Sequence, residues 1–360
     1  MKILFLTKYD RRGASSRYRY FQYYQGLEKA GFTCYTAALF NQNYVTHLYQ
    51  NSFVKYLDAL QAFFRRLLIL RKLNQFDILV IEKEIFPYLP MVFEGFIKNL
   101  DFPIIIDYDD ALFHQYDHHR YKIIRKLLGS KIASVMRCAD LVTVGNSYLA
   151  EYALKAGAQW VEILPTIIDL DKYRSIKQHT NTNVVKIAWI GTPKTEHYLQ
   201  EVAPALAHVA TKYPIELYVI GGRSTRIRDV TVNIRPWTEE TEVSELLKCD
   251  IGIMPLPDEP WERGKCGLKL IQYMACGLPV IASPVGVNSE IIDHGINGFL
   301  ASNVTDWVTA FEALSKDVEL RSKMGQAGRW QVEEHYCLQV TTPQFIHLLE
   351  LLIANQNKLC

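Results

Sequence analysis

The sequence predicts an α/β protein of two doubly wound domains with parallel sheets, and three observations carry this prediction. Short apolar runs bounded by turn residues alternate with amphipathic helical stretches, the pattern of successive β-α-β units. The two halves open alike, because Met1–Thr7 and Val185–Gly191 each read as a strand leading into a polar, glycine-containing loop and a helix. A chain of 360 residues is also too long for one ordinary core and suits two.

The apolar runs are short enough to be strands buried on both faces of a parallel sheet. The predicted strands are Ile3–Leu6, Ile78–Ile81, Ile104–Ile106, Leu141–Val144, Val185–Ile190, Ile215–Ile220, Ile251–Met254 and Pro279–Ala282. Amphipathic helices are expected over Arg17–Ala30 and Val243–Lys248. The apolar segment Pro343–Ala354 is expected to form a helix that packs back on either domain.

The chain loses its periodicity and becomes polar over residues 165–184, which indicates a connection between domains. We therefore expect an N-terminal domain over 1–170 and a C-terminal domain over 171–340, with a final helix at 341–356 that returns to the first. Ligands of such folds bind at the carboxyl ends of the strands. The cleft between two facing domains is accordingly the expected active site.

The composition excludes several classes of protein. With 49% apolar and 22% charged residues, the chain is folded rather than disordered. It has no run of 18 apolar residues, so no transmembrane helix is expected, and its opening residues read as a strand rather than a signal peptide. Seven scattered cysteines without a CxxC pair argue against a disulfide framework or a zinc site and favour the reducing cytoplasm.

Charge is divided unevenly between the halves. Residues 1–180 hold 24 basic and 17 acidic side chains, whereas 181–360 hold 16 and 21. A basic half often indicates an anionic partner, and the many aromatic residues favour a membrane surface or a phosphorylated substrate over a nucleic acid. Phe53–Lys72 and Arg120–Arg137 read either as interfacial helices or as helices that pack on a sheet with a basic outer face. An ordinary solvated basic face is the open alternative.

The most informative stretch is Trp261–Glu290, in which Gly267 precedes a helix expected over Leu268–Ala275. Glycine at a helix entry lets backbone N–H groups approach a phosphate, and the helix N-terminus favours negative charge. Lys265 and Lys269 add positive charge beside it. The alternative is an ordinary helix cap followed by a turn into a strand.

The loop after the first strand lacks the GxGxxG pattern of NAD-type sites. Gly13, Ser15 and Ser16 nevertheless form a candidate anion-binding loop before a helix. Arg17 and Arg19 stand in the first turn of that helix, where the dipole disfavours cations. We interpret them as contacts to the diphosphate of an acceptor, and a solvated helix start remains open.

Three carboxylates, those of Asp107, Asp109 and Asp110, follow one predicted strand. Like charges repel and raise one another's pKa, so such a cluster favours a functional site. The Asp107-x-Asp109 spacing also occurs in haloacid-dehalogenase-type phosphatases, but Ala111 stands where they have threonine. A metal pair among the residues His114, Asp117, His118 and His119 is a further alternative, and we expect no metal.

The segment MACGLPVIASPVG, followed by GINGFL, resembles the C-terminal domain of glycosyltransferase family 4. The resemblance extends over almost the whole chain and is strongest over 249–300. It implies the α/β GT-B fold, with two facing Rossmann-like doubly wound domains and a central cleft. It also implies a retaining transferase that uses a nucleotide-diphosphate sugar as its donor substrate and needs no cofactor.

In that family two glutamates, with seven residues between them, precede Ala-Met-Ala-Cys-Gly. Here the second falls on Gln272, whose amide is able to bond a ribose hydroxyl, and the first on Gly264, for which Glu262 is the candidate replacement. The family's first loop of the second domain holds Gly-Arg and a later lysine. Gly191 is retained, and Thr192 and His197 take the positions of the two cations.

The substitutes available for the missing cations are Lys194, Arg263, Lys265 and Lys269. We favour Lys265 and Lys269, together with the N–H groups near Gly267 and Leu268, because they flank the helix start. In the loop that holds the base, Trp237 is a candidate for stacking, or alternatively a core anchor.

The family's His-Asp pair falls on Asp109 and Asp110, which the resemblance places at the sugar and the acceptor. The expected acceptor is a glycan or a lipid-linked glycan, met by the N-terminal domain at the inner face of the membrane. Two rival functions stay open, a GT-B sugar-nucleotide epimerase and a catalytically silent nucleotide-binding partner subunit.

Overall fold

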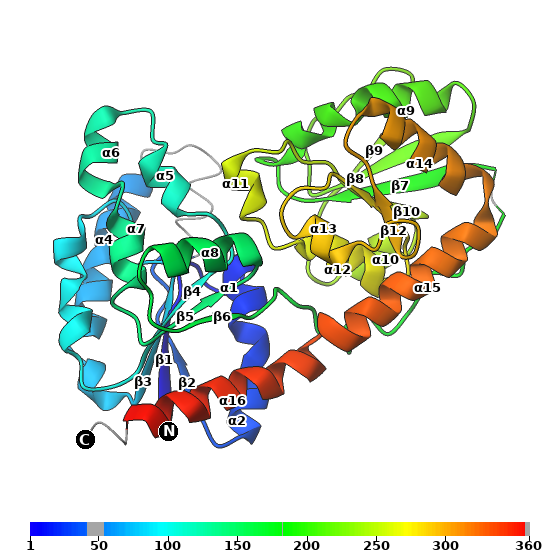
Figure 1. The fold of residues 1–360 in the computed structure, drawn as a ribbon. Coiled ribbons are helices and arrows are strands. Elements are labelled where there is room, and N and C mark those ends of the chain that lie inside the picture. The colour runs from blue at the N-terminus through cyan, green and yellow to red at the C-terminus, as the bar shows by residue number, and fades with distance from the viewer. Residues whose placement is uncertain (42–53, 182, 357–360) are drawn as a thin grey trace. The chain divides into compact units, whose positions relative to one another are not determined.

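The computed structural model describes residues 1–41, 54–181 and 183–356. These residues divide into two compact units. The first unit comprises residues 1–166 with the C-terminal stretch from Thr341, and the second comprises Ile167–Val340. In each unit helices pack around a twisted sheet (Figure 1).

The first unit has a six-stranded parallel sheet with the strand order β2-β1-β3-β4-β5-β6. Its central strands are buried along almost their whole length, whereas β2 at one edge is largely exposed and β6 at the other edge is partly exposed. The strands are β1 (Lys2–Leu6), β2 (Thr33–Thr36), β3 (Ile78–Glu82), β4 (Ile104–Tyr108), β5 (Leu141–Val144) and β6 (Val161–Ile163).

The second unit repeats this architecture with the order β12-β11-β10-β7-β8-β9. All five strand pairs are parallel. The strands are β7 (Val185–Ile190), β8 (Ile215–Ile220), β9 (Thr231–Arg235), β10 (Ile251–Met254), β11 (Val280–Ala282) and β12 (Gly298–Leu300). The order reverses at β7 and β10, which is the position where doubly wound sheets bind ligands.

The predicted α/β class and all eight predicted strands are confirmed. The four strands missing from the prediction, β2, β6, β9 and β12, are the edge strands of the two sheets. An edge strand needs no continuous apolar run, because part of it faces water.

The helices of the first unit cover both faces of its sheet (Figure 1). They are α1 (Ala14–Arg19), α2 (Tyr24–Lys29), α4 (Val54–Leu70), α5 (Phe113–Asp117), α6 (Lys122–Leu128), α7 (Lys131–Met136) and α8 (Ser147–Lys155), with 3-10 turns η1 (Phe21–Tyr23), η2 (Leu73–Gln75), η3 (Met91–Phe93) and η4 (Gly95–Asn99).

The second unit contains η5 (Glu196–Glu201), α9 (Ala203–Ala210), α10 (Glu242–Leu246), α11 (Pro260–Arg263), α12 (Leu268–Ala275), α13 (Asn288–Ile291), α14 (Val304–Lys316) and α15 (Val318–His335). The helix α12 has the predicted bounds. The last helix, α16 (Leu338–Gln356), contains the predicted segment Pro343–Ala354. Its Phe345 makes an edge-to-face contact with Tyr23, so the C-terminal part of α16 packs on the first unit.

The prediction of one continuous helix over Arg17–Ala30 is wrong. The helix stops at Arg19, and Tyr20 leaves the helical region with φ −133° and ψ −63°. The physical reason is a buried polar contact, since the Tyr20 hydroxyl donates to Asp107 Oδ2 over 2.8 Å. A turn of 3-10 helix then leads into α2.

Within the described residues, no helix is long and apolar enough to cross a membrane.

Candidate functional site

In the second unit, the loops that follow β7 and β8 lie in direct contact. The Gly191 N–H donates to Ile220 O over 3.0 Å. Gly221 has φ +84°, and a Cβ there would lie 2.2 Å from Gly191 O and 3.2 Å from Trp237 Cβ. A side chain at Gly221 would therefore collide with the backbone, so glycine is required for this close approach. The contact brings Gly191 and Trp237 together at the end of the sheet where the strands have their carboxyl ends.

Tyr273 fixes the helix α12 against the same end of the sheet. The Tyr273 hydroxyl accepts from Ile190 N over 2.9 Å and donates to Ile253 O over 3.2 Å. Gly252 makes room for the ring, because a Cβ there would lie 2.3 Å from Tyr273 Cγ. Gly267, the N-cap of α12, has φ +68°. The N-terminal turn of α12 is thus held in place by packing and by buried hydrogen bonds.

Lys269 stands in that first turn, with Nζ 4.2 Å from the centroid of the Trp189 ring. Burial lowers the pKa of Lys269 to about 7, and repulsion by Lys265 adds to the shift. Lys265 itself lies 5.9 Å from the Tyr198 ring centroid. Within the described part of the chain, Lys269 forms no ion pair with a carboxylate. Two lysines beside a helix N-terminus are suited to bind an anion.

Gln272, which aligns with the family's second glutamate, and Glu262, the candidate replacement for the first, are both buried. Glu262 accepts a hydrogen bond from the Tyr198 hydroxyl, and Gln272 lies within α12. Trp237 donates from Nε1 to Glu242 Oε2 over 2.7 Å, which fixes the plane of the indole. Thr192 and Lys194 are exposed in the loop after β7. Leu268 follows Gly267 at the start of α12.

Glu196 also belongs to this region, although it was not among the site residues predicted from the sequence. Its carboxylate accepts N–H groups from the residues Arg223, Ser224 and Thr225, over 2.8, 2.9 and 2.6 Å. Burial raises the pKa of Glu196, but the Thr225 hydroxyl and these N–H groups outweigh it and lower that pKa. The same hydrogen bonds order the loop that follows β8. In the sequence, Glu196 is one charged residue after a polar loop, and nothing in its pattern indicates this role.

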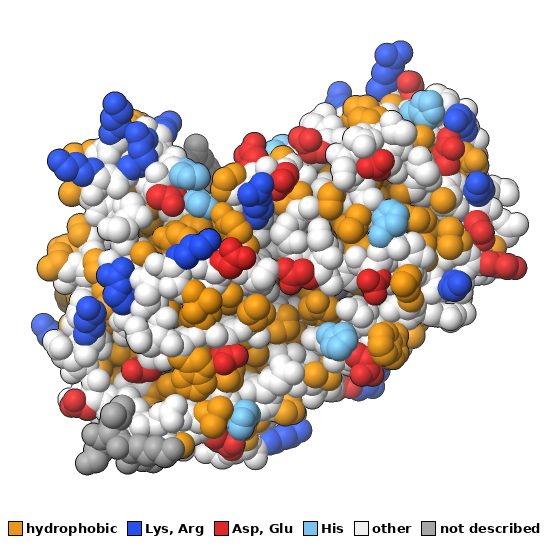
Figure 2. All heavy atoms as spheres, in the orientation of Figure 1, with side chains coloured by type: hydrophobic (Ala, Val, Ile, Leu, Met, Phe, Trp, Pro, Cys, Tyr) orange, Lys and Arg blue, Asp and Glu red, His pale blue; other side chains and the backbone are white. Residues whose placement is uncertain are grey.

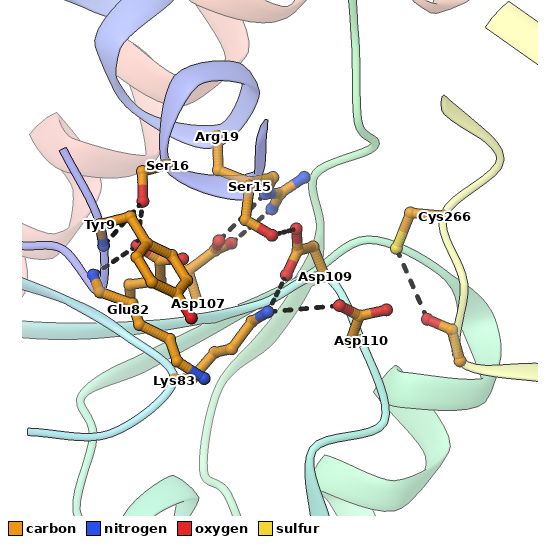
Figure 3. Close-up of polar contacts among 12 residues, drawn as sticks. Tyr9, Ser15, Ser16, Arg19, Glu82, Lys83, Asp107, Asp109, Asp110 and Cys266 are labelled. Carbon is orange, nitrogen blue, oxygen red and sulfur yellow. Dashed lines mark hydrogen bonds and ion pairs between the residues drawn. The ribbon is translucent and has the colours of Figure 1, made fainter. Parts of the chain in front are cut away.

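In the first unit, a network of charged side chains gathers at the carboxyl ends of β1, β3 and β4 (Figure 3). Asp107 is buried and accepts from Arg19 Nε over 3.0 Å, from Tyr20, and from Thr143 Oγ1 over 2.7 Å. Arg19 also donates to Leu164 O over 2.5 Å. This corrects the expectation that Arg19 borders an acceptor, because its guanidinium is buried and paired.

Arg17 is likewise buried rather than exposed on a solvated helix start, with its guanidinium 4.8 Å from the Tyr18 ring centroid. The expected anion-binding loop is also corrected. Ser15 donates its hydroxyl to Asp109, and Ser16 donates to Glu82 Oε2 over 2.7 Å. Both hydroxyl hydrogens are therefore directed at carboxylates instead of a phosphate. Gly13 packs on Tyr9, where a Cβ would lie 2.5 Å from Tyr9 Cβ.

Asp109 and Asp110 share one cation, Lys83 (Figure 3). Lys83 Nζ lies 2.6 Å from Asp109 Oδ1 and 3.4 Å from Asp110 Oδ2. Burial by itself raises the pKa of Asp109, but Lys83 and the Ser15 hydroxyl outweigh it and lower that pKa below its ordinary value. Lys83 was not among the site residues predicted from the sequence. Its signal was the run Glu82-Lys83-Glu84 after a buried strand, comparable to the acids after β4.

Three of the four residues named as an alternative metal site lie together in the structure. His114, Asp117 and His118 place ligand atoms within 4.8 Å of one another, and they form the one such group of three among the described residues. His114 Nδ1 lies 3.0 Å from Asp117 Oδ1, and Nε2 lies 2.8 Å from the Tyr148 hydroxyl. His119 is not part of this group.

Each of the two basic stretches, Phe53–Lys72 and Arg120–Arg137, contains a cationic side chain that is buried. Arg66 is buried and donates to Thr7 O over 2.7 Å. Lys131 is buried between Glu84 and Glu94, at 2.6 and 2.7 Å. Phe53 lies outside the described residues. The outward cations of α6 remain, and Figure 2 shows Lys and Arg side chains gathered over that helix.

Comparison with known proteins agrees with this architecture. Residues 184–317 match the family model of glycosyl transferases group 1. A D-inositol 3-phosphate glycosyltransferase of Pseudarthrobacter chlorophenolicus is 36% identical over 101 residues, 28% of this chain and 23% of that protein. An N-acetyl-alpha-D-glucosaminyl L-malate synthase of Bacillus anthracis is 28% identical over 160 residues, 41% of this chain and 40% of that protein. The matches thus span less than half of these two relatives.

Solved structures are similar over nearly the whole chain. HepE of Anabaena, in complex with UDP-glucose, has a TM-score of 0.68 at 16% identity, and the match covers 97% of this chain and 99% of that one. The two six-stranded parallel sheets and this likeness establish the fold. The chain therefore shares the two-domain fold of these solved structures, and residues 184–317 of its second unit match the family model of glycosyl transferases group 1.

Proposed function

We propose that this protein is a retaining glycosyltransferase that moves a sugar from a nucleoside-diphosphate donor to an acceptor hydroxyl. The observation that carries the proposal is the environment of Lys269. Its ammonium group lies beside a helix N-terminus and packs on Trp189, and burial lowers its pKa to about 7. Lys269 is half-buried. A cation that is partly removed from water is costly unless an anion compensates it, and a diphosphate would supply that anion.

The donor would bind by its diphosphate at the first turn of α12, against Lys265, Lys269 and the N–H group of Leu268. Gln272 would hold the ribose, and Trp237 would contact the base. The complex of HepE with UDP-glucose supports a sugar nucleotide as ligand, so UDP is the first probe.

The reaction breaks the bond between the anomeric carbon and the diphosphate oxygen, and forms a bond from that carbon to the acceptor oxygen. In a same-face mechanism the acceptor proton passes to the departing diphosphate. The protein then contributes positioning and electrostatics. Lys265 and Lys269 would neutralise the diphosphate, and the acids after β4 would stabilise positive charge at the anomeric carbon.

A silent partner subunit is the second candidate, and a specific observation favours it. Gly264 has no side chain where the family has glutamate, and Thr192 replaces an arginine. Nucleotide binding without any turnover, with or without acceptors, would identify such a subunit. Turnover of a sugar nucleotide without an acceptor, which yields an epimer instead of free sugar, would identify an epimerase.

For the acceptor we propose a lipid-linked glycan at an anionic membrane surface, within cell-surface glycan or glycolipid synthesis. Helix α4 supports this, because it exposes apolar side chains on its outer face. The exposed fractions are 62% for Leu57, 69% for Leu60 and 63% for Phe64. Arg65, Arg71 and Lys72 are exposed on the same segment, the composition of an interfacial helix.

A thermal-shift panel of UDP, GDP, ADP and their glucose derivatives tests the proposed function. A nucleotide at ~100 times its dissociation constant should stabilise the protein by ~2.7 kcal/mol. The exposed Lys323→Ala variant should respond like the wild type, and Lys269→Ala should be stabilised clearly less. No stabilisation of the wild type by any member of the panel would contradict the proposal.

A further inference from the structure

Lys83 directly follows β3 and has a backbone conformation that residues other than glycine rarely adopt. Its φ is +67°, in the left-handed region, where strain costs about 1–3 kcal/mol. Three hydrogen bonds hold it there. Lys83 N donates to Asp107 O over 3.0 Å, Glu84 N donates to Glu82 O over 2.8 Å, and the Tyr108 hydroxyl donates to Lys83 O over 2.7 Å. Strain that the surrounding structure maintains in this way is typical of functional sites.

The strained backbone directs the Lys83 side chain at the end of the neighbouring strand β4. Its ammonium group contacts Asp109 at 2.6 Å and Asp110 at 3.4 Å. The exposed fraction of the side chain is 8% for Lys83, 11% for Asp109 and 32% for Asp110. The Ser15 hydroxyl donates a hydrogen bond to the other carboxylate oxygen of Asp109. Asp109 is therefore enclosed by a cation and a donor, whereas Asp110 remains open to a ligand.

We propose that Lys83 is a positioning residue that makes Asp109 a buried counter-ion and leaves Asp110 as the carboxylate that meets the substrate. Two adjacent carboxylates without a cation would repel, and one would take up a proton. A single ammonium group that contacts both offsets this repulsion and fixes the direction of Asp110. The role of Asp110 rests on the proposed function, whereas the pairing of Lys83 with Asp109 is independent of it.

The pairing is tested without any substrate, by thermal unfolding of variants between pH 4 and pH 8. The lowered pKa of Asp109 makes the pair stabilise the fold above the unfolded pKa, and this contribution is lost as pH falls through the folded pKa. In Lys83→Gln the carboxyl of Asp109 loses its cation, and burial then raises its pKa, so that it takes up a proton as pH falls toward 4. The variant should therefore lose most melting temperature near neutral pH and progressively less toward pH 4. The double variant Lys83→Gln/Asp109→Asn should recover at least about half of the loss, because it leaves no unpaired charge.

The division of roles is tested by turnover, with release of UDP from UDP-glucose as the probe reaction. Asp110→Asn should keep the wild-type melting temperature and the KM for UDP-glucose, and lose ~100-fold in kcat. Lys83→Gly relaxes the positive φ, so it should be more stable than Lys83→Gln. Both should nevertheless lose the same factor in kcat, because both lack the ammonium group.

Three results would overturn the proposal: a wild-type melting profile for Lys83→Gln, no recovery in the double variant, or wild-type turnover for Asp110→Asn. Failure of the proposed function is distinguishable, because then the wild type itself would either bind no UDP or turn over no UDP-glucose. The melting profiles of Lys83→Gln and the double variant still decide the Lys83–Asp109 pairing in that case.

Discussion

The ammonium group of Lys269 lies 4.2 Å from the ring centroid of Trp189, at the first turn of α12. An aromatic face attracts a cation but neutralises none of its charge. The pKa of Lys269 therefore stays low, at about 7, and an arriving anion would raise it. Binding of a diphosphate at this position is accordingly linked to uptake of a proton.

This linkage predicts how the affinity for UDP depends on pH. Above pH 7 the free Lys269 is increasingly neutral, so binding must protonate it, and the affinity should fall by up to ~10-fold per pH unit between pH 7 and pH 9. The phosphate groups, with a second pKa of about 6, are already ionised in that range. Calorimetry in buffers of different ionisation enthalpy measures the proton uptake. Lys269→Arg, whose charge does not titrate, is the control that should flatten the profile, and a flat profile in the wild type would contradict the linkage.

The reaction should not require a divalent metal. Lysines and helix N–H groups are expected to neutralise the diphosphate, which is the role that a metal ion would otherwise fill. Turnover should survive EDTA, and His114→Ala should behave like the wild type. Complete loss in EDTA that manganese or magnesium restores would instead indicate a metal site among Asp107, Asp109 and Asp110.

The Arg19–Asp107 pair should be essential for stability. Asp107→Asn leaves the Arg19 guanidinium buried without its anion, which destabilises proteins by about 3–5 kcal/mol. Urea unfolding of the variant should show this loss, and the exposed Asp101→Asn is the control expected to change little. Wild-type stability of Asp107→Asn would mean that Tyr20 and Thr143 suffice to hold the site.

The outer face of α4 should bind anionic vesicles. Each basic residue near such a surface adds about 1 kcal/mol, which salt screens. Co-sedimentation should need anionic lipid and fade at high salt. It should also fall when Arg65, Arg71 and Lys72 are changed to Glu, and when Leu60 and Phe64 are changed to Ser. Arg66 is left unchanged in this design because it is buried.

The matched control for this experiment is Lys323→Glu on α15, in the second unit. Equal recovery with neutral and anionic vesicles, or none at low salt, would exclude an anionic membrane as the partner. Formation of dimers that the Leu60 and Phe64 changes abolish would identify a second copy of the chain as the occupant of this face.

The sequence predicts the centres of both sheets well and their edges poorly. Central strands such as Ile78–Glu82 are buried on both faces and must be apolar throughout. The edge strand Val161–Ile163 is short and partly exposed, so its pattern resembles a loop. The bounds of α12 were predictable, because Gly267 and Gly277 mark both ends of an apolar helix.

Burial of individual cations was not predictable from the sequence. Arg19, Arg66 and Lys131 carry the same side chains as their exposed neighbours. Their interior positions depend on partners far away in the chain, such as Asp107 for Arg19 and Glu84 for Lys131. The contact of Lys83 with Asp109 was not predictable for the same reason, because it depends on the parallel pairing of β3 with β4.

The central claim is that the second unit binds a nucleoside diphosphate through Lys265 and Lys269, and calorimetric titration with UDP at pH 7 tests it most directly. Each of Lys265→Ala and Lys269→Ala should weaken binding by roughly 1.5–3 kcal/mol, the contribution of a charge-assisted hydrogen bond. Lys323→Ala should bind like the wild type. Unchanged affinity in both Lys265→Ala and Lys269→Ala would contradict the claim and move the diphosphate site away from α12.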